Sequence, residues 1–294
     1  MGLHTITIEQ FRQRGSHTGF CYNNDLFITD RVEDVERFKS PCRIDAVLVL
    51  VCTGGEVDCS VNLKHYRICR DMILVNFPDD IIQIHHAEAL EAYAVLISSG
   101  FLNELEIDFK RRSDFYLDIR QNASCCLPHA EIVALKPYYS LLSANISSVR
   151  TEVFEVVRGI IHAFSYTIIS VVSLYQRQYY KENVGMTRNK QLFNKFMALV
   201  KLYHTYARGV KFYAGKLCLT PNYLSGAIKE YTGKTAAEWV DEYVILEAKI
   251  MLKDSSLSIQ EISYKLNFPS QSAFGKYFRQ QVGVSPKQYR NKEK

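Results

Sequence analysis

The sequence lacks the local signatures of several common protein classes. Its N-terminal stretch MGLHTITIEQFRQRG has no apolar segment of the kind that a secretory signal needs, so we do not expect export. It contains no GxSxG, P-loop or GxGxxG motif, the signatures of α/β-hydrolases, phosphate-binding loops and dinucleotide-binding folds. We therefore expect a cytoplasmic protein that is not an enzyme.

Cysteine and histidine are present, but not in metal-binding patterns. The 8 cysteines form no CxxC pair and no zinc spacing, which is typical of reduced thiols. Cys125 and Cys126 are adjacent and could form a disulfide only with strain. His85 and His86 are neighbours in a predicted strand, so their side chains point to opposite faces and cannot both ligate one interior metal. The sequence predicts no metal and no cofactor.

The bulk composition is that of a soluble globular protein. The chain has 294 residues, of which 47% are apolar and 23% are charged. This excludes a collagen-like chain, a disulfide-stapled miniprotein and a mostly disordered protein. At roughly 100–200 residues per domain, the length predicts two domains.

The positive charge is concentrated at one end of the chain. The net charge of the whole chain is +5, yet residues 187–294 hold 18 Lys and Arg against 8 Asp and Glu. Residues 1–186 hold the other 18 basic residues against 23 acidic ones. This asymmetry predicts a polyanion-binding module joined to a part that does not bind polyanions, although a chance excess of surface lysine gives the same count.

Short strand-like runs occupy residues 43–102. The run 46–51 is apolar and rich in β-branched residues, and 53–56 (Thr-Gly-Gly-Glu) is a predicted turn. Further runs begin near residues 57, 73, 81 and 92, with turn signals between them. Several short strands at regular spacing predict a β-sandwich or a small barrel within residues 1–130.

Residues 131–182 show helical periodicity instead. Apolar residues recur there at steps of three and four. The stretch 159–176 has no Lys, Arg, Asp or Glu and is close to the minimum length of a membrane span, but His162 and several hydroxyl residues interrupt it. We interpret it as a buried or dimer-forming helix and expect no membrane contact. The polar stretch 183–190 is the predicted linker.

The remaining residues, 191–294, are predicted to form successive short helices. Thr235 and Ser258 are each followed three residues later by a glutamate, Glu238 and Glu261, which is the pattern of a capping box. Thr220-Pro221 places proline at the first position of another helix, where its missing N–H costs nothing.

Two segments of this region share one plan. Each has a short helix, a turn of three or four residues, a capped second helix and a terminal glycine, at about 210–233 and 258–282. This is the helix-turn-helix plan, although one such pair alone is more often an ordinary helical hairpin. Between them, a helix of about 18 residues within 235–253 would span roughly 27 Å. That length is close to the ~34 Å between successive major-groove faces on one side of a DNA duplex.

Residues 195–290 resemble the C-terminal DNA-binding domain of the AraC/XylS family of bacterial transcription regulators. The residues that carry the resemblance are 257–268 (LSIQEISYKLNF), Gln271–Phe274, Phe278, Arg279, Val282–Pro286, Tyr289 and Arg290. The preceding part is similar, more loosely, to the sensor of such regulators. The resemblance implies an α+β protein with a cupin-like β-barrel or sandwich at 1–130, dimerisation helices at 131–182 and an all-α DNA-binding domain at 191–294.

The resemblance also implies which side chains face DNA. The carried-over positions are Asn222, Ser225, Gly226 and Lys229 in the first pair, and Gln271, Ser272, Gly275 and Lys276 in the second. Arg279 is within reach of phosphate or guanine. Gly226 and Gly275 depart from the usual pattern because they offer no side-chain contact, so part of the readout is expected to use DNA shape or water. We assign Tyr223, Leu224, Ile228, Phe274 and Phe278 to the core.

Together these observations predict a sequence-specific transcription activator controlled by a ligand or by dimerisation. The expected partners are double-stranded DNA through its major groove, a second copy of the chain, RNA polymerase and a small-molecule effector. Two alternatives stay open: a cupin-type small-molecule-binding protein or enzyme with a helical appendage, and an architectural protein that binds DNA without sequence preference.

Overall fold

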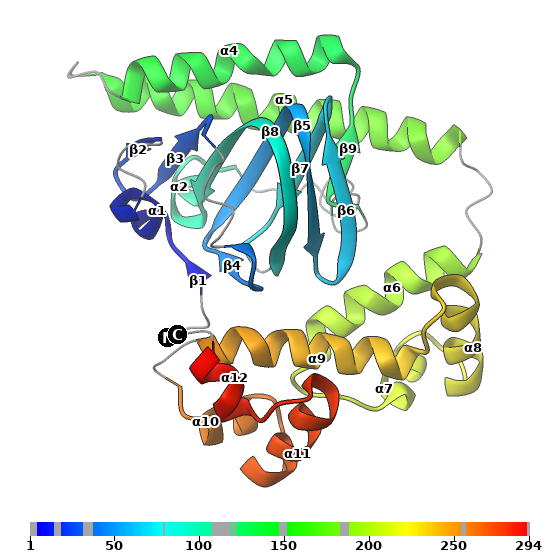
Figure 1. The fold of residues 1–294 in the computed structure, drawn as a ribbon. Helices are drawn as coiled ribbons and strands as arrows, with labels where there is room; N and C mark the ends of the chain where they lie inside the picture. Colours follow the sequence, from blue (N-terminus) through cyan, green and yellow to red (C-terminus); the bar gives the residue numbers. More distant parts are fainter. Residues whose placement is uncertain are drawn as a thin grey trace. The chain divides into compact units, whose positions relative to one another are not determined.

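The computed structural model describes residues 5–14, 19–31, 38–78, 80–107, 119, 122–146, 152–182, 188–253 and 257–292. Residues 5–183 and residues 184–294 belong to two different compact units. The first unit combines a β-sheet with helices, and the described part of the second unit is helical (Figure 1). The α+β class expected from the sequence therefore holds at this level.

The first unit is built on an antiparallel sheet. In hydrogen-bonding order its strands run β2-β3-β8-β5-β7-β9, with β6 paired to β5, and β1 and β4 form a separate two-stranded parallel sheet. The described strands do not close into a barrel, so the barrel form of the expected β domain is wrong. The bounds of the strands are β1 Thr5–Ile6, β2 Phe20–Tyr22, β3 Leu26–Thr29, β4 Arg43–Ile44, β5 Ala46–Val61, β6 Lys64–Cys69, β7 Met72–Asn76, β8 Ile82–Ser98 and β9 Ser124–Cys126.

The predicted turn at 53–56 is also wrong, because β5 continues through it as one long strand. The pairing of β5 with β8 shifts register on both sides of Gly54. An odd number of extra residues reverses which side chains face inward. Accordingly, Leu48 and Leu50 share a core cluster with Val57 and Cys59. Gly55 has φ +62, and a Cβ there would collide with the backbone of Ala89, so this bulge requires glycine.

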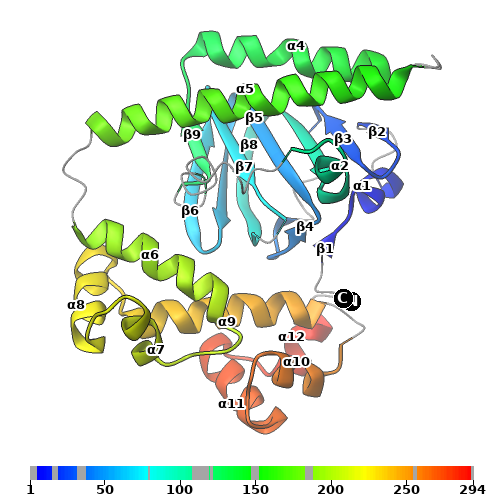
Figure 2. The same ribbon diagram turned by 180° about the vertical axis from the view of Figure 1, so that it is seen from behind.

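The opposite face of the sheet is covered by helices. Figures 1 and 2 both show α4 (His129–Ile146) and α5 (Val153–Glu182) side by side over it. The stretch Val153–Tyr175 of α5 is long and apolar enough to cross a membrane by length and composition, with a mean hydropathy of 1.5. However, α5 buries a continuous stripe against the sheet and α4: Val157, Ile161, Phe164, Ile168 and Val172. A stripe of this spacing is that of a core helix. The described part of this unit also contains two short helices, α1 (Ile8–Arg14) and α2 (Ser99–Glu104).

The second unit begins its described part with α6. This helix spans Arg188–Tyr203, so the last three residues of the predicted linker are helical, and residues 183–187 lie outside the described residues. The helices that follow are α7 Val210–Lys216, α8 Pro221–Thr232, α9 Ala236–Lys253, α10 Ile259–Lys265, α11 Gln271–Val282 and α12 Pro286–Lys292.

The helix pairs α7–α8 and α10–α11 repeat the same backbone geometry. Each first helix is followed by a residue in the left-handed region, Cys218 at φ 56 and Asn267 at φ 53. Each second helix has 12 residues, begins at a hydroxyl cap and ends at a left-handed glycine, Gly233 at φ 79 and Gly283 at φ 85. We call α7–α8 the first helix pair and α10–α11 the second helix pair.

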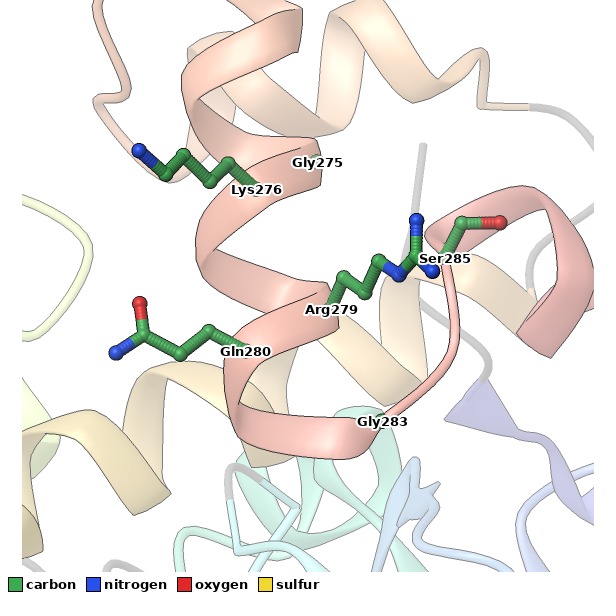
Figure 3. A pocket seen from close by; sticks show the side chains of 6 residues that line it. All are labelled: Gly275, Lys276, Arg279, Gln280, Gly283 and Ser285. Atoms are coloured by element: carbon green, nitrogen blue, oxygen red, sulfur yellow. The ribbon is translucent and has the colours of Figure 1, made fainter.

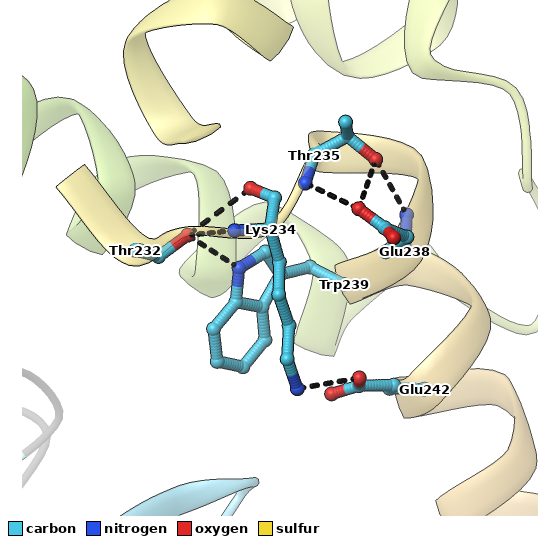
Figure 4. A network of polar contacts seen from close by, with 6 residues as sticks. All are labelled: Thr232, Lys234, Thr235, Glu238, Trp239 and Glu242. Atoms are coloured by element: carbon cyan, nitrogen blue, oxygen red, sulfur yellow. Dashed lines mark hydrogen bonds and ion pairs between the residues drawn. The ribbon is translucent and has the colours of Figure 1, made fainter. Parts of the chain in front are cut away.

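The predicted helix caps are confirmed. The Ser258 hydroxyl accepts from the backbone N–H of Glu261, whose carboxylate accepts from the backbone of Ser258. Thr235 and Glu238 make the same reciprocal bonds, at 3.3 and 2.6 Å. Figure 4 shows this box beside Trp239, whose indole N–H donates to the Thr232 hydroxyl at 3.0 Å. These bonds fix the corner between the first helix pair and α9.

The cap at Thr235 predicts an acid-sensitive contribution to stability. Hydrogen bonds from the backbone and the hydroxyl of Thr235 lower the pKa of Glu238 below its usual 4.5. A carboxyl group with a lowered folded-state pKa stabilises the fold above its unfolded pKa, and this contribution is lost as the pH falls through the folded value. We expect Glu238→Gln to unfold at a lower temperature than the wild type at neutral pH and at the same temperature well below pH 4.5. Thermal unfolding across this range measures the difference, and a gap that persists in acid would contradict the assignment.

Candidate nucleic-acid interface

Helix α8 presents one face to solvent while the other anchors it. Leu224 and Ile228 are fully buried and Ala227 nearly so. Asn222, Gly226 and Lys229 are exposed and Ser225 is partly exposed. Because residues three and four apart share a helical face, these side chains form one outward surface along α8.

Helix α11 repeats this arrangement. Phe274 and Phe278 are fully buried, as predicted. Gln271, Ser272, Lys276 and Arg279 are exposed, and Gly275 is partly exposed. An open groove runs along the outward surface, where Lys276 and Gln280 extend to one side of the helix and Arg279 extends toward Ser285 (Figure 3). The structure therefore places the predicted site residues on the two equivalent helices.

The cations of these surfaces make no direct polar contact within the described part of the chain. Within the described part of the chain, the side chains of Lys229, Lys276 and Arg279 make no hydrogen bond or ion pair. Other cations of the second unit do have partners, since Lys234 Nζ lies 2.6 Å from Glu242 Oε1 and Arg290 Nε donates to Leu252 O at 3.1 Å. Unpaired cations on an exposed helix are free to neutralise an anionic partner such as phosphate.

Two glycines on these surfaces have no structural reason to be glycine. A Cβ added at Gly226 or at Gly275 would meet nothing within 4 Å. Glycine inside a helix costs about 0.5–1 kcal/mol relative to alanine. The absence of a side chain therefore has no use within the unit, and it lets an external partner approach the helix backbone closely.

One core assignment is wrong. Tyr223 is 42% exposed, and the Arg188 guanidinium lies 5.9 Å from its ring centroid. The first turns of α6 run along this flank of α8, since Asn189 donates to Glu230 at 2.9 Å and the Phe193 and Tyr231 rings are 5.7 Å apart. Sequence reasoning missed Arg188 because periodicity does not show which neighbouring helix covers which flank.

The histidines and cysteines of the first unit form no metal cluster among the described residues. His85 Nε2 lies 3.0 Å from Ser60 Oγ, and burial lowers the pKa of its imidazole. Burial raises the pKa of the Cys125 thiol to about 12. A thiol with so high a pKa carries almost no thiolate at neutral pH, so it is a poor nucleophile.

Comparison with known proteins assigns residues 213–292 of the second unit. Residues 213–292 match the helix-turn-helix domain family HTH_18. They form an AraC-type helix-turn-helix domain. The AraC-type domain is 36% identical over 77 residues to the regulatory protein PocR of Salmonella typhimurium, covering 26% of this chain and 25% of that protein. It is 27% identical over 77 residues to the arabinose operon regulatory protein of Escherichia coli, covering 26% of each.

A longer stretch matches the transcriptional activator RhaS of Salmonella schwarzengrund. The identity is 26% over 106 residues, which covers 36% of this chain and 38% of RhaS. The chain thus spans well under half the length of these relatives. Their likeness describes the AraC-type domain and leaves the first unit unassigned.

Solved structures show similarly limited likeness. The C-terminal domain of AraT, a response regulator from Geobacillus stearothermophilus, is 24% identical, covers 36% of this chain and 87% of its own, and has a TM-score of 0.33. Wild-type ToxT from Vibrio cholerae, solved with a bound unsaturated fatty acid, is 16% identical and covers 93% of this chain and 95% of its own, with a TM-score of 0.38. Scores this low carry no structural argument.

Proposed function

We propose that the protein is a sequence-specific DNA-binding transcription regulator in which α8 and α11 enter the major groove. The observation that carries this proposal is the repetition of one geometry. Both helix pairs present a 12-residue, hydroxyl-capped helix with an outward surface of unpaired cations and small polar side chains. The second helix of a helix-turn-helix unit contacts base edges through such a surface.

The helix α9 gives the two surfaces a fixed separation. Its 18 residues correspond to a length of roughly 27 Å. Eleven of them are buried, from Ala236 to Leu252, so the helix is the core of the second unit. Successive major grooves on one face of a duplex are ~34 Å apart. A rigid spacer of this length therefore suits two helices, α8 and α11, that enter successive grooves and contact the bases (the reading helices).

Different side chains take different roles in this interface. The amide and hydroxyl groups of Asn222, Ser225, Gln271 and Ser272 are suited to hydrogen bonds with base edges. The cations of Lys229, Lys276 and Arg279 are suited to phosphate or guanine. Gly226 and Gly275 allow close approach, which favours readout through DNA shape and bridging water.

The first unit is proposed to regulate this activity as a cupin-like sensor. A small-molecule effector would act only if its affinity differs between two states of the protein. Helices α4 and α5 carry exposed apolar side chains suited to a two-fold dimer, among them Val133, Leu141 and Leu174 at 55%, 51% and 59% exposure. Sedimentation of the full chain, which distinguishes a dimer from a monomer, tests this assembly. We further propose that the regulator acts in the cytoplasm. There it activates transcription through contact with RNA polymerase.

The proposal is tested by selecting bound sequences from a random duplex library with the full chain. A sequence-specific regulator enriches a defined site, and excess nonspecific DNA competes poorly with it. A non-specific architectural protein binds every sequence alike. A small-molecule-binding protein or enzyme with a helical appendage enriches nothing. Either of the last two results would overturn the proposed function.

Lys276→Ala distinguishes base readout from phosphate contact on α11. If Lys276 contacts a base, we expect specific binding to weaken by about 1–3 kcal/mol. If it contacts phosphate, binding weakens on all sequences and the salt dependence falls by about one unit of slope. Titrations of the selected site at several salt concentrations measure both. Lys195→Ala, which removes an exposed cation of α6 outside α8 and α11, is the matched control. Unchanged affinity of Lys276→Ala at every salt concentration would remove this side chain from the interface.

A further inference from the structure

A short segment between α6 and α7 contacts the turn of the second helix pair. The Arg208 guanidinium donates to the carbonyl of Asn267 at 2.9 Å and to that of Leu266 at 3.3 Å. The Asn267 side-chain amide donates in return to the carbonyl of Tyr206 at 2.9 Å. The guanidinium carbon also lies 3.8 Å from the ring centroid of Phe268. Residues about 60 positions apart are thereby linked by three hydrogen bonds and one cation–π contact.

The site at which Arg208 binds needs a planar donor. Leu266 is the C-terminal cap of α10, and Asn267 follows it in the left-handed region at φ 53. Carbonyls at the end of a helix lack partners within the helix and carry the negative end of its dipole. A guanidinium group can donate to two neighbouring carbonyls at once and stack on an aromatic ring, whereas a lysine ammonium cannot do both.

Both ends of this link are anchored. On the side of the first helix pair, the fully buried Tyr213 donates its hydroxyl to the carbonyl of Ala207 at 2.6 Å. On the other side, the Phe268 ring lies 5.3 Å from that of Phe274 and 5.1 Å from that of Tyr277. Both of these partner rings belong to α11. A chain of direct contacts therefore runs from α7 through Arg208 to α11. It exists in addition to the contacts that run through α9.

We infer that Arg208 is a positioning residue that sets the angle between α8 and α11 and so the spacing of the two half-sites that the domain accepts. This inference rests on the proposed function. The second helix pair also packs on α9, where the Tyr277 hydroxyl of α11 donates to Asp241 Oδ1 at 2.8 Å, but contacts with one element alone leave rotation about that element open. The additional link at Arg208 removes this freedom. Moving one half-site by one base pair rotates it by about a tenth of a turn around the duplex, which a rigid pair of reading helices cannot follow.

The test uses the full chain and duplexes in which the two selected half-sites are separated by different numbers of base pairs. We expect the wild type to prefer one spacing over its neighbours by on the order of tenfold, the cost of a poorly matched base pair. Arg208→Ala should reduce this preference to about threefold or less, with little change in affinity for an isolated half-site. Arg208→Lys should behave like Arg208→Ala, because lysine cannot reproduce the two-carbonyl contact.

Arg290→Ala is the matched control. Arg290 also donates to a backbone carbonyl, that of Leu252, but it joins α12 to α9. This variant should lose stability and keep the spacing preference. Asn267→Gly retains a residue suited to the left-handed region and removes only the bond to Tyr206, so it should weaken the preference part-way.

The outcomes separate this inference from the function on which it rests. Wild-type spacing preference in a folded Arg208→Ala or Arg208→Lys protein would overturn the inference and leave the proposed function intact. If Arg208→Ala does not fold, Arg208→Lys and Asn267→Gly decide the question. If the wild type enriches no sequence at all, the proposed function fails, and the inference fails with it.

Discussion

Gly226→Glu is expected to weaken specific DNA binding by about 100-fold or more, close to 3 kcal/mol, while the protein itself becomes slightly more stable. The glutamate fills the space through which the DNA backbone approaches α8 and places a negative charge among phosphates. The fold loses nothing, because a Cβ at Gly226 meets no atom within 4 Å. Replacing a helical glycine adds roughly 0.5–1 kcal/mol of helix stability.

The two effects of this substitution have opposite signs, which makes the prediction specific. Titration of the selected site measures the loss of binding, and thermal unfolding measures the gain in stability. Gly100→Glu is the matched control, since Gly100 is an exposed helical glycine of α2 in the acidic first unit. It should leave DNA binding unchanged. Undiminished binding by Gly226→Glu would show that this surface of α8 does not face DNA.

The second large effect is expected at a buried His–Glu pair in the core of the second unit. His204 Nε2 lies 3.3 Å from Glu247 Oε2, and the two side chains are 7% and 3% exposed. The other ring nitrogen of His204 lies 3.1 Å from Val200 O and 3.0 Å from Lys201 O, and the ring lies 4.8 Å from that of Tyr243. Removing one partner of such a pair strands the other in a low-dielectric interior, so Glu247→Ala should lower the free energy of unfolding by about 3–5 kcal/mol.

Chemical denaturation that follows the transition of the second unit measures this loss. Glu242→Ala is the matched control, because its pair with Lys234 is exposed (38% and 47%) and surface pairs are worth about 0–1 kcal/mol. The double substitution His204→Phe with Glu247→Leu should recover most of the stability, since apolar residues often replace a buried pair without cost. A loss below about 1 kcal/mol for Glu247→Ala would show that the pair does not stabilise this core.

Elements set by local chemistry were predictable from the sequence. The boxes at Thr235–Glu238 and Ser258–Glu261 follow from side-chain reach over three residues, and both form. The burial of Phe274 and Phe278 follows from helical period. The repetition of one pattern in both helix pairs likewise needs no long-range information.

Features decided by distant partners were not predictable. The 53–56 segment has the composition of a turn, yet its pairing with β8 makes it a bulge within β5. Tyr223 fits an apolar position of α8, but the flank it occupies carries Arg188 of α6. The link from Arg208 to Asn267 joins residues 59 positions apart, and nothing in either local sequence indicates the other.

Hydroxyl-radical footprinting of the full chain on its selected DNA site tests the central claim most directly. Two DNA-contacting helices, α8 and α11, joined through α9 predict two protected patches, about 10–10.5 base pairs apart, on one face of the duplex. Substitutions on α8 should remove one patch, and substitutions on α11 the other. A single patch, or protection spread evenly around the helix, would contradict the account.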